Sequence, residues 1–316
     1  MNNIPSVDLT DFLSDDAERK QKFVNEIGKA YEEIGFVALK GHFLSDELVT
    51  NLYSEIKKFF ALPVATKRKY EIEGIGGQRG YVSFGKESAK GKKEGDLKEF
   101  WHFGQYVEDN PSLEAEYPAN VHVEELPAFN SVGKETYKML EKTGVYVLRA
   151  LALFLELDEH YFDKYAKNGN SILRPIHYPP ITSEPKDAVR AAAHGDINLI
   201  TLLMGAQGKG LQVQNHKGEW LDAIAEPDEL VINVGDMLSR HSNNRLKSTI
   251  HRVVNPPREK WGTSRYSIPF FMHPISEMPL NCLENCIDDA HPKLYKDISA
   301  GEFLNERLIE LGLIKK

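Results

Sequence analysis

The sequence predicts a mainly β core with flanking helices. From Ser171 to about Pro274, short β-branched or aromatic runs are separated by Gly, Pro and Asn turns, a pattern typical of an antiparallel sandwich or barrel. The preceding segment, Pro127 to Leu157, carries apolar residues at helical spacing. Because 41% of the chain is hydrophobic, it can form one large core or two modest domains.

In the N-terminal part, the sequence predicts strands that alternate with helices. Ile4 to Leu9 alternates apolar and polar residues, as a short strand does. Residues Asp15 to Ile34 have apolar positions at helical spacing, and Phe36 to Leu39 follows as a strand. Ser45 is placed to cap a further helix that stops before Pro63.

For residues 74–104 the sequence predicts two loops followed by a strand. Gly74 to Gly80 matches neither the dinucleotide nor the P-loop motif, so we interpret it as a loop. Lys86 to Lys98 is highly charged and is expected to be a solvated loop, of a kind that can also act as a lid. Leu97 to Gly104 alternates and should pair into a sheet, where core packing is the favoured role for its large aromatic residues.

The β region itself divides at polar turns. Asn215 to Gly218 marks a turn between two short strands, and Leu230 to Val234 is predicted to be a further strand. Asn243-Asn244 precedes the strand that holds His251. The tail from Ser299 to Leu311 has the pattern of an amphipathic helix.

Charge and composition exclude several partners. The net charge of −8 would repel phosphate backbones and anionic membranes, so no nucleic acid and no membrane partner is expected. No apolar run approaches the roughly 20 residues that span a bilayer, and the start lacks a signal-peptide pattern. Cys282 and Cys286 are interpreted as two thiols. We therefore predict a cytoplasmic protein.

Three residues predict a metal site. His194 and Asp196 precede an apolar run, and alternate side chains of a strand share one face about 6.6 Å apart. His251 lies in a second β-branched run. Two imidazoles and one carboxylate form the facial ligand set of non-haem Fe(II) oxygenases, which leaves open positions for substrate and dioxygen. The pattern therefore suggests redox chemistry.

Arg265 and Ser267 predict a carboxylate receptor beside this metal. Their i, i+2 spacing lets a guanidinium and a hydroxyl point the same way from one strand. The even separation of His251 and Arg265 would keep both on one face of regular strands. By contrast, His216 and His241 lie in predicted turns and are expected to be exposed.

With these residues the sequence resembles the 2-oxoglutarate and Fe(II)-dependent dioxygenases, in the branch that includes isopenicillin N synthase and the plant flavonoid and gibberellin oxygenases. The resemblance spans most of the chain. It is carried by three motifs: His194-Gly195-Asp196, His251 and Arg265-Tyr266-Ser267. Weaker family features follow in the same order: Ile4-Pro5-Ser6-Val7-Asp8-Leu9, His177-Tyr178-Pro179-Pro180, Gly210-Leu211-Gln212-Val213 and Asn233-Val234-Gly235-Asp236.

The resemblance implies a double-stranded β-helix, the jelly-roll barrel, with the metal inside its mouth. It divides the chain into four parts: an N-terminal α/β region at 1–120, bracing helices at 121–170, the jelly-roll core at 171–280 and a helical tail at 281–316. The strand pattern is compatible with this barrel but does not by itself select it among β architectures.

The resemblance also implies Fe(II), 2-oxoglutarate and dioxygen. Tyr178 would donate its hydroxyl to one 2-oxoglutarate carboxylate, while Arg265 and Ser267 hold the distal one. A small-molecule substrate would be hydroxylated, or desaturated or cyclised, with release of succinate and carbon dioxide. We expect a monomer or a weak homo-oligomer.

The substrate pocket is harder to predict, because the family contacts its substrates through variable segments. The candidate pocket residues are Tyr81, Trp101, His102, His177 and Phe271.

Three alternative functions stay open. An oxidase like isopenicillin N synthase would use Arg265 and Ser267 to hold the substrate's own carboxylate, without a keto acid. A Zn(II) hydrolase could use the same three ligands, although no general base stands at a recognisable spacing. A non-catalytic binding protein could keep the same barrel.

Overall fold

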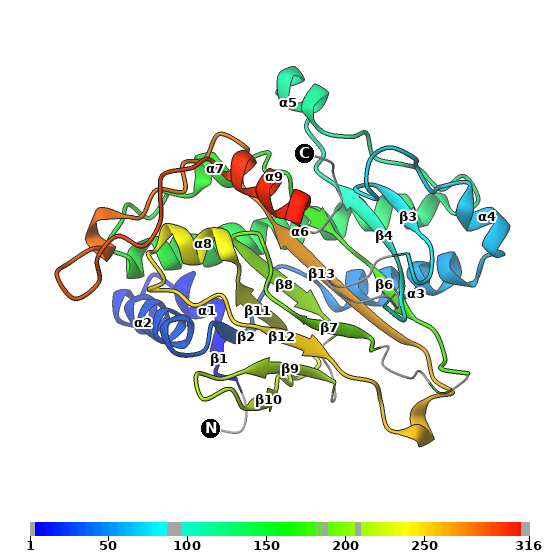
Figure 1. Cartoon of the computed structure of the whole chain (residues 1–316), viewed down its shortest axis with the longest axis horizontal. Coiled ribbons are helices and arrows are strands. Elements are labelled where there is room, and N and C mark those ends of the chain that lie inside the picture. The colour runs from blue at the N-terminus through cyan, green and yellow to red at the C-terminus, as the bar shows by residue number, and fades with distance from the viewer. Residues whose placement is uncertain (1–3, 87–95, 183, 185–188, 206–209, 311–316) are drawn as a thin grey trace.

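The computed structural model describes residues 4–86, 96–182, 184, 189–205 and 210–310 and shows two facing sheets with helices against them (Figure 1). The larger sheet has the order β1 (Ser6–Asp8), β2 (Phe36–Lys40), β11 (Leu230–Val234), β8 (Ile200–Met204), β13 (Arg265–Met272), β5 (Ile172–Leu173), β4 (Glu99–Gly104) and β3 (Gly80–Val82), with β6 (Ile176–Tyr178) paired to β13 and β4. The smaller sheet has the order β10 (Trp220–Asp222), β9 (Leu211–Gln214), β12 (His251–Val253) and β7 (Ala191–His194). This arrangement is the predicted jelly roll.

The N-terminal strands are part of the larger sheet. β1 runs parallel to β2, and β2 pairs antiparallel with β11, so the predicted first strands extend the barrel at one edge. β3 and β4 extend the opposite edge through pairing of β4 with β5 and β6. The N-terminal region is therefore continuous with the barrel in its hydrogen bonding.

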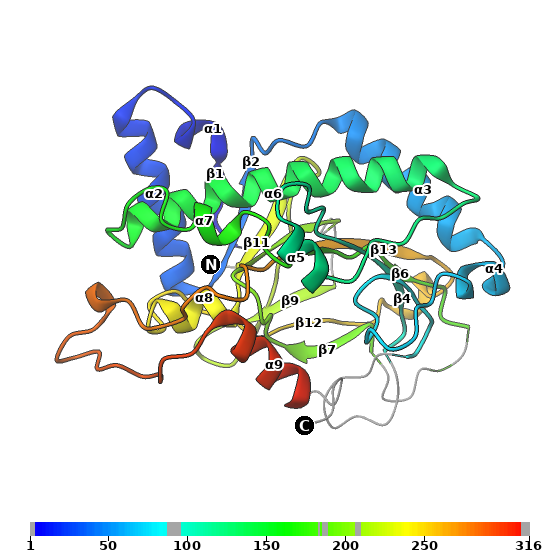
Figure 2. The same ribbon diagram turned by 90° about the horizontal axis from the view of Figure 1, so that it is seen from above.

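The helices lie mainly against the larger sheet. They are α1 (Leu9–Phe12), α2 (Ala17–Glu33), α3 (Asp46–Ala61), α4 (Val64–Arg68), α5 (Pro111–Glu116), α6 (Pro127–Phe154), α7 (Asp163–Ala166), α8 (Asp236–His241) and α9 (Ala300–Glu310), with 3-10 turns at Arg258–Lys260 and Glu284–Cys286. Figure 2 shows the long α6 running past α2 and α3, and both of these helices contact it. Ser45 caps α3 by accepting a hydrogen bond from the Leu48 amide, as predicted.

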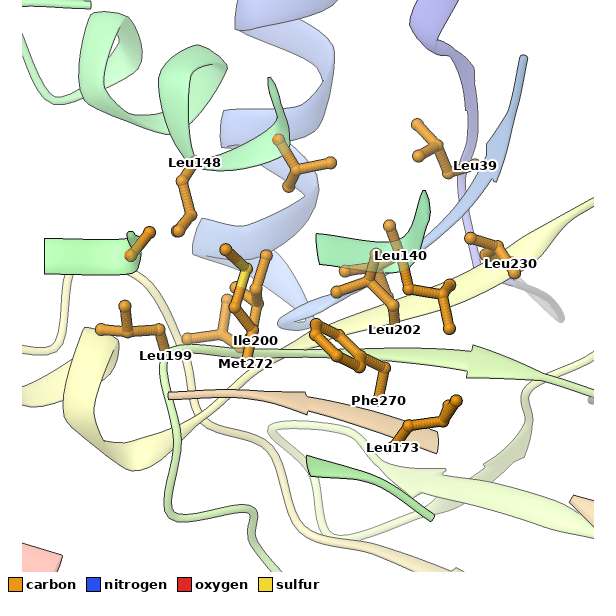
Figure 3. Close-up of a cluster of buried hydrophobic side chains, with 14 of the residues drawn as sticks. Leu39, Leu140, Leu148, Leu173, Leu199, Ile200, Leu202, Leu230, Phe270 and Met272 are labelled. Carbon is orange, nitrogen blue, oxygen red and sulfur yellow. The ribbon is translucent and has the colours of Figure 1, made fainter. Parts of the chain in front are cut away.

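The main core lies between α6 and the larger sheet. Leu140 and Leu148 of α6 are fully buried in the same cluster as Leu202 and Phe270 of the sheet (Figure 3). At Gly144 a Cβ atom would lie 2.4 Å from the sulfur of Met272, so this helix position needs glycine for its close approach. Burial of this apolar surface holds the sheet rigid beneath the helix.

The opposite face of the larger sheet, here called the interior face, looks toward the smaller sheet. A second buried cluster lies there and joins Phe36 and Val231 of the larger sheet to Val213 and Val253 of the smaller one. Because alternate residues of a strand point to opposite faces, the strands that bury Leu202 against α6 also present polar residues inside the barrel.

Several predictions concern single segments. Cys282 and Cys286 are buried free thiols, as the sequence predicts. Most of the charged loop predicted from Lys86 to Lys98, and Leu311 at the end of the predicted tail helix, lie outside the described residues. Within the part of the chain that the structure describes, no helix is long and apolar enough to cross a membrane.

The prediction for His241 is wrong. The residue ends α8 and is only 2% exposed. Its Nδ1 donates to the Asn281 carbonyl at 2.6 Å, and its Nε2 accepts from the Tyr161 hydroxyl at 2.9 Å. α8 continues through His241, so this residue lies on the buried face of the helix and not in a turn. His216 is exposed in its turn, as predicted.

Burial of His241 predicts a pH-dependent stability. Burial lowers the pKa of His241 from 6.5 to about 4, so between these values the unfolded chain binds a proton that the folded chain does not. The free energy of unfolding should be fully maintained above pH 6.5 and should fall by about 2–3 kcal/mol as the pH drops to about 4. Urea unfolding at several pH values measures this slope. In His241→Asn the slope should be shallower, whereas the matched surface variant His216→Asn should keep it; equal slopes in all three proteins would contradict the assignment.

Candidate active site

The three predicted metal ligands meet at the mouth of the barrel. His194 ends β7, and His251 begins β12 directly opposite it in the paired register. Asp196 lies just beyond β7. The turn after the strand, and not strand alternation, therefore brings its carboxylate close to the two histidines. Oδ1 of Asp196 lies 3.9 Å from Nε2 of His194 and 3.8 Å from Nε2 of His251. One ligand atom from each residue lies within 4.8 Å of the others. The 3.9 and 3.8 Å separations from Oδ1 are within the span of about 4.2 Å that two metal–ligand bonds of about 2.1 Å can bridge.

Both imidazoles are oriented for metal binding by backbone carbonyls. Nδ1 of His194 lies 2.7 Å from the Ala192 oxygen, and Nδ1 of His251 lies 3.2 Å from the Thr249 oxygen. These contacts place the proton on Nδ1 and leave the Nε2 lone pair for a metal. Desolvation by the surrounding atoms, followed by the charge of His251, lowers the pKa of His194, although 46% of its side chain is exposed. This ligand is therefore neutral near pH 7.

Asp196 is held by the larger sheet. Its Oδ2 accepts a 2.6 Å hydrogen bond from the Thr201 hydroxyl on β8 and a 2.8 Å hydrogen bond from the Asn233 amide on β11. Burial alone would raise its pKa, but the two histidines and these hydrogen bonds outweigh burial and lower the pKa of Asp196. The carboxylate is therefore ionised, with Oδ1 turned toward the imidazoles.

The donor set fits Fe(II). Two neutral imidazoles and one carboxylate on one side of an ion leave the other octahedral positions open. The ion and Asp196 together carry a charge of +1, which favours an anionic co-substrate such as a keto acid.

The predicted carboxylate receptor lies on β13 and β6 of the larger sheet. Arg265 pairs with Tyr178 across these strands, and its guanidinium carbon lies 5.3 Å from the centre of the Tyr178 ring. Its Nη1 is buried, and no hydrogen-bond partner for it occurs among residues 4–86, 96–182, 184, 189–205 and 210–310. Ser267 is buried two residues along the same strand. A buried, unpaired guanidinium nitrogen fits a bound carboxylate.

The prediction that the even separation of His251 and Arg265 keeps both side chains on one face of regular strands is wrong. The two residues lie on different strands, β12 and β13, in different sheets. The two sheets face each other (Figure 1), so both strands lie in the wall of one barrel.

Two of the predicted pocket residues lie on the interior face. Phe271 pairs with Thr201, whose side chain holds Asp196, so both point into the barrel. The guanidinium carbon of Arg174 lies 5.1 Å from the Phe271 ring centre and 4.5 Å from that of Phe100. Nε of Arg174 donates to Nε2 of His102 at 2.5 Å. These four side chains form one cluster.

The other predicted pocket residues occupy the opposite face. Trp101 is fully buried against the aromatic rings of the main core, as the core-packing interpretation expects. Tyr81 and His177 both hydrogen bond to the buried Glu99, at 2.5 and 2.8 Å. Glu99 also accepts a 2.7 Å hydrogen bond from Lys67. Strand alternation therefore separates these residues from Phe271 and His102.

Sequence reasoning did not assign four residues that the structure brings to the site. Thr201 and Asn233 hold the metal-binding carboxylate, Arg174 joins the aromatic cluster, and Arg190 lies against Tyr178. In the sequence, Asn233 stands out only as part of a weak family motif. A lone charge in the apolar run before His194 could have drawn attention to Arg190, whereas Thr201 looks like any β-branched strand residue.

Fold and site together define a non-haem Fe(II) oxygenase. Residues 4–125 match the model of the N-terminal region of non-haem dioxygenases in morphine synthesis, and residues 169–274 match that of the 2OG-Fe(II) oxygenase superfamily. The chain is 31% identical over 315 residues to a 2-oxoglutarate-Fe(II) type oxidoreductase of Emericella nidulans, covering 95% of this chain and 88% of that protein. The chain belongs to the 2-oxoglutarate and Fe(II)-dependent oxygenase family, and its cofactors are Fe(II) and 2-oxoglutarate.

Solved structures and a further sequence relative agree with this assignment. A 2OG-Fe(II) oxygenase family protein from Caulobacter crescentus superimposes with a TM-score of 0.89 at 43% identity, covering 98% of this chain and 99% of that one. A full-length Neurospora crassa protein in complex with alpha-KG gives a TM-score of 0.83 at 31% identity, covering 96% of this chain and 95% of that one. A proline hydroxylase of Petromyces alliaceus is 30% identical and covers 97% of this chain and 99% of that protein.

The hydrogen bond from Thr201 predicts a change in metal affinity. Thr201→Val keeps the shape of the side chain but removes the donor to Asp196, so Mn(II), used as a redox-stable probe, should bind about 10–100-fold more weakly. Calorimetric titration measures this affinity. Thr136→Val is the matched control, because the buried Thr136 hydroxyl in α6 has no partner in the described part of the chain. Equal loss in both variants, or none in Thr201→Val, would show that Thr201 does not support the metal ligand.

Proposed function

We propose that this protein hydroxylates, or desaturates or cyclises, a small molecule. The substrate would lie against the cluster of Phe100, His102, Arg174 and Phe271 inside the barrel. The observation that carries the proposal is the combination, in one barrel, of the His194, Asp196 and His251 site with the buried Nη1 atom of Arg265, which has no partner in the described part of the chain. Bound Fe(II), with 2-oxoglutarate and dioxygen, supplies an oxidant while 2-oxoglutarate is converted to succinate and carbon dioxide. The chain's own residues bind and orient the reactants and exclude water.

The 2-oxoglutarate contacts are proposed to be Arg265, Ser267 and Tyr178. Arg265 and Ser267 share the interior face of β13, and the pairing of Arg265 with Tyr178 brings the tyrosine beside the guanidinium. A carboxylate bound here would satisfy the buried Nη1 atom of Arg265. The planar guanidinium fork and a hydroxyl together fix the carboxylate's orientation.

The substrate end is proposed to be the cluster of Phe100, His102, Arg174 and Phe271. His102 accepts from Arg174 through Nε2 and donates through Nδ1 to the Gly77 carbonyl at 2.6 Å, so it is neutral and positions the guanidinium. The guanidinium also contacts the rings of Phe100 and Phe271, which restrict its position. We infer that Arg174 binds a carbonyl or carboxylate group of the substrate while Phe271 excludes water. The Neurospora crassa protein in complex with thymine, and the relative named a proline hydroxylase, involve small molecules with such acceptor groups.

Three further points stay predictions. They are the four-part division at 1–120, 121–170, 171–280 and 281–316, the monomeric or weakly homo-oligomeric state, and the cytoplasmic location.

The function predicts a coupled requirement for three reagents. Incubation of the protein with a metabolite mixture should yield succinate only when Fe(II), 2-oxoglutarate and dioxygen are all present, as NMR can measure, and ¹⁸O₂ should label a hydroxylated product. His194→Ala should abolish turnover because it removes a metal ligand, while His216→Ala, at an exposed turn, should retain it. Oxygen consumption without 2-oxoglutarate would support the oxidase alternative. Turnover with Zn(II) and no oxygen would support the hydrolase, and failure to bind Fe(II) would support a binding protein.

A further inference from the structure

A second arginine lies beside the proposed 2-oxoglutarate receptor. Arg190 immediately precedes β7, and its side chain is 6% exposed. Its guanidinium carbon lies 5.5 Å from the centre of the Tyr178 ring, and that of Arg265 lies 5.3 Å from the same centre. The buried Arg190 and the partly buried Arg265 therefore lie beside the same tyrosine ring.

Neither guanidinium is neutralised by the described part of the chain. Nε of Arg190 and Nη1 of Arg265 are buried without a hydrogen-bond partner there, and no described carboxylate forms an ion pair with either residue. Burial, followed by the positive charge of Arg265, lowers the pKa of Arg190. Burying two like charges together is costly unless an anion joins them. The arrangement thus has the electrostatic character of an anion site.

Another arginine of the barrel, Arg252, has protein partners for its guanidinium. Arg252 on β12 donates from Nε and Nη2 to the Gln212 side chain at 3.0 and 2.9 Å, and its guanidinium stacks over Trp220 at 3.9 Å. Its neighbour His251 points to the metal, so Arg252 faces the other side of β12. Nε of Arg252 therefore has a protein partner, whereas Nε of Arg190 has none in the described part of the chain.

We propose that Arg190 binds the distal carboxylate of 2-oxoglutarate together with Arg265, and so selects a dicarboxylic keto acid over a monocarboxylic one. The inference rests on the proposed function of the site. One carboxylate offers two oxygens and about four lone-pair directions, enough to accept from two guanidinium forks at once. A single negative charge between two positive charges also removes their repulsion, which a neutral chain end cannot do.

The test compares two keto acids of equal chain length. 2-Oxopentanoate has a methyl group where 2-oxoglutarate has its distal carboxylate. Their affinities are measured by calorimetry on the Mn(II)-loaded protein, for the wild type, Arg190→Gln, Arg190→Lys and the matched control Arg252→Gln. Arg190→Gln should weaken 2-oxoglutarate binding about 10–100-fold because a buried charge pair is lost, and should leave 2-oxopentanoate affinity unchanged. Arg252→Gln should behave as the wild type.

Equal 2-oxoglutarate affinity in the wild type and Arg190→Gln would overturn the inference. An equal loss for both keto acids would also overturn it, because that result indicates a general structural role. If Arg190→Gln does not fold, Arg190→Lys replaces it: loss of the fork should again weaken 2-oxoglutarate selectively, and unchanged affinity would contradict the proposal. A wild-type protein that binds Mn(II) but not 2-oxoglutarate would instead refute the proposed function.

Discussion

The carboxylate of Asp196 joins the two sheets of the barrel, and the rest of the site depends on this interaction. Its Oδ1 atom faces the two histidines of the smaller sheet, while Oδ2 accepts hydrogen bonds from Thr201 and Asn233 of the larger sheet. A buried carboxylate is stable only when such donors and positive charges compensate its lost hydration. The same contacts that keep it ionised therefore fix the metal relative to the larger sheet.

That link matters because, in the proposed mechanism, the metal and the co-substrate would be held by different parts of the barrel. The imidazoles come from β7 and β12, whereas Arg265, Ser267 and Phe271 all come from alternate positions of β13. The intervening residues of β13, such as Phe270, pack in the main core with α6. One strand thus connects a closely packed apolar layer to the reactive interior, and small changes in its position would move the co-substrate receptor relative to the metal.

The sequence predicted those parts of the site whose chemistry is local. His194 and Asp196, or Arg265 and Ser267, stand two residues apart, so residue type and spacing were informative. Arg265 and Ser267 also stand at alternate positions of one strand, β13, as their spacing predicts. The sequence did not show which candidate pocket residues face the barrel interior and which face the main core. Trp101 and His102, for example, are adjacent in the chain yet face opposite sides of β4. The contacts of Arg190 depend on the approach of two sheets, and the burial of His241 depends on a helix that continues past an apparent turn.

The most direct test of the central claim is an anaerobic crystal structure of the protein with Fe(II) and 2-oxoglutarate, using anomalous scattering to locate the iron. The account predicts one iron bonded to Nε2 of His194, Nε2 of His251 and Oδ1 of Asp196, while Oδ2 keeps its hydrogen bonds to Thr201 and Asn233. Iron bound elsewhere, or an Asp196 carboxylate turned away from both histidines, would contradict it.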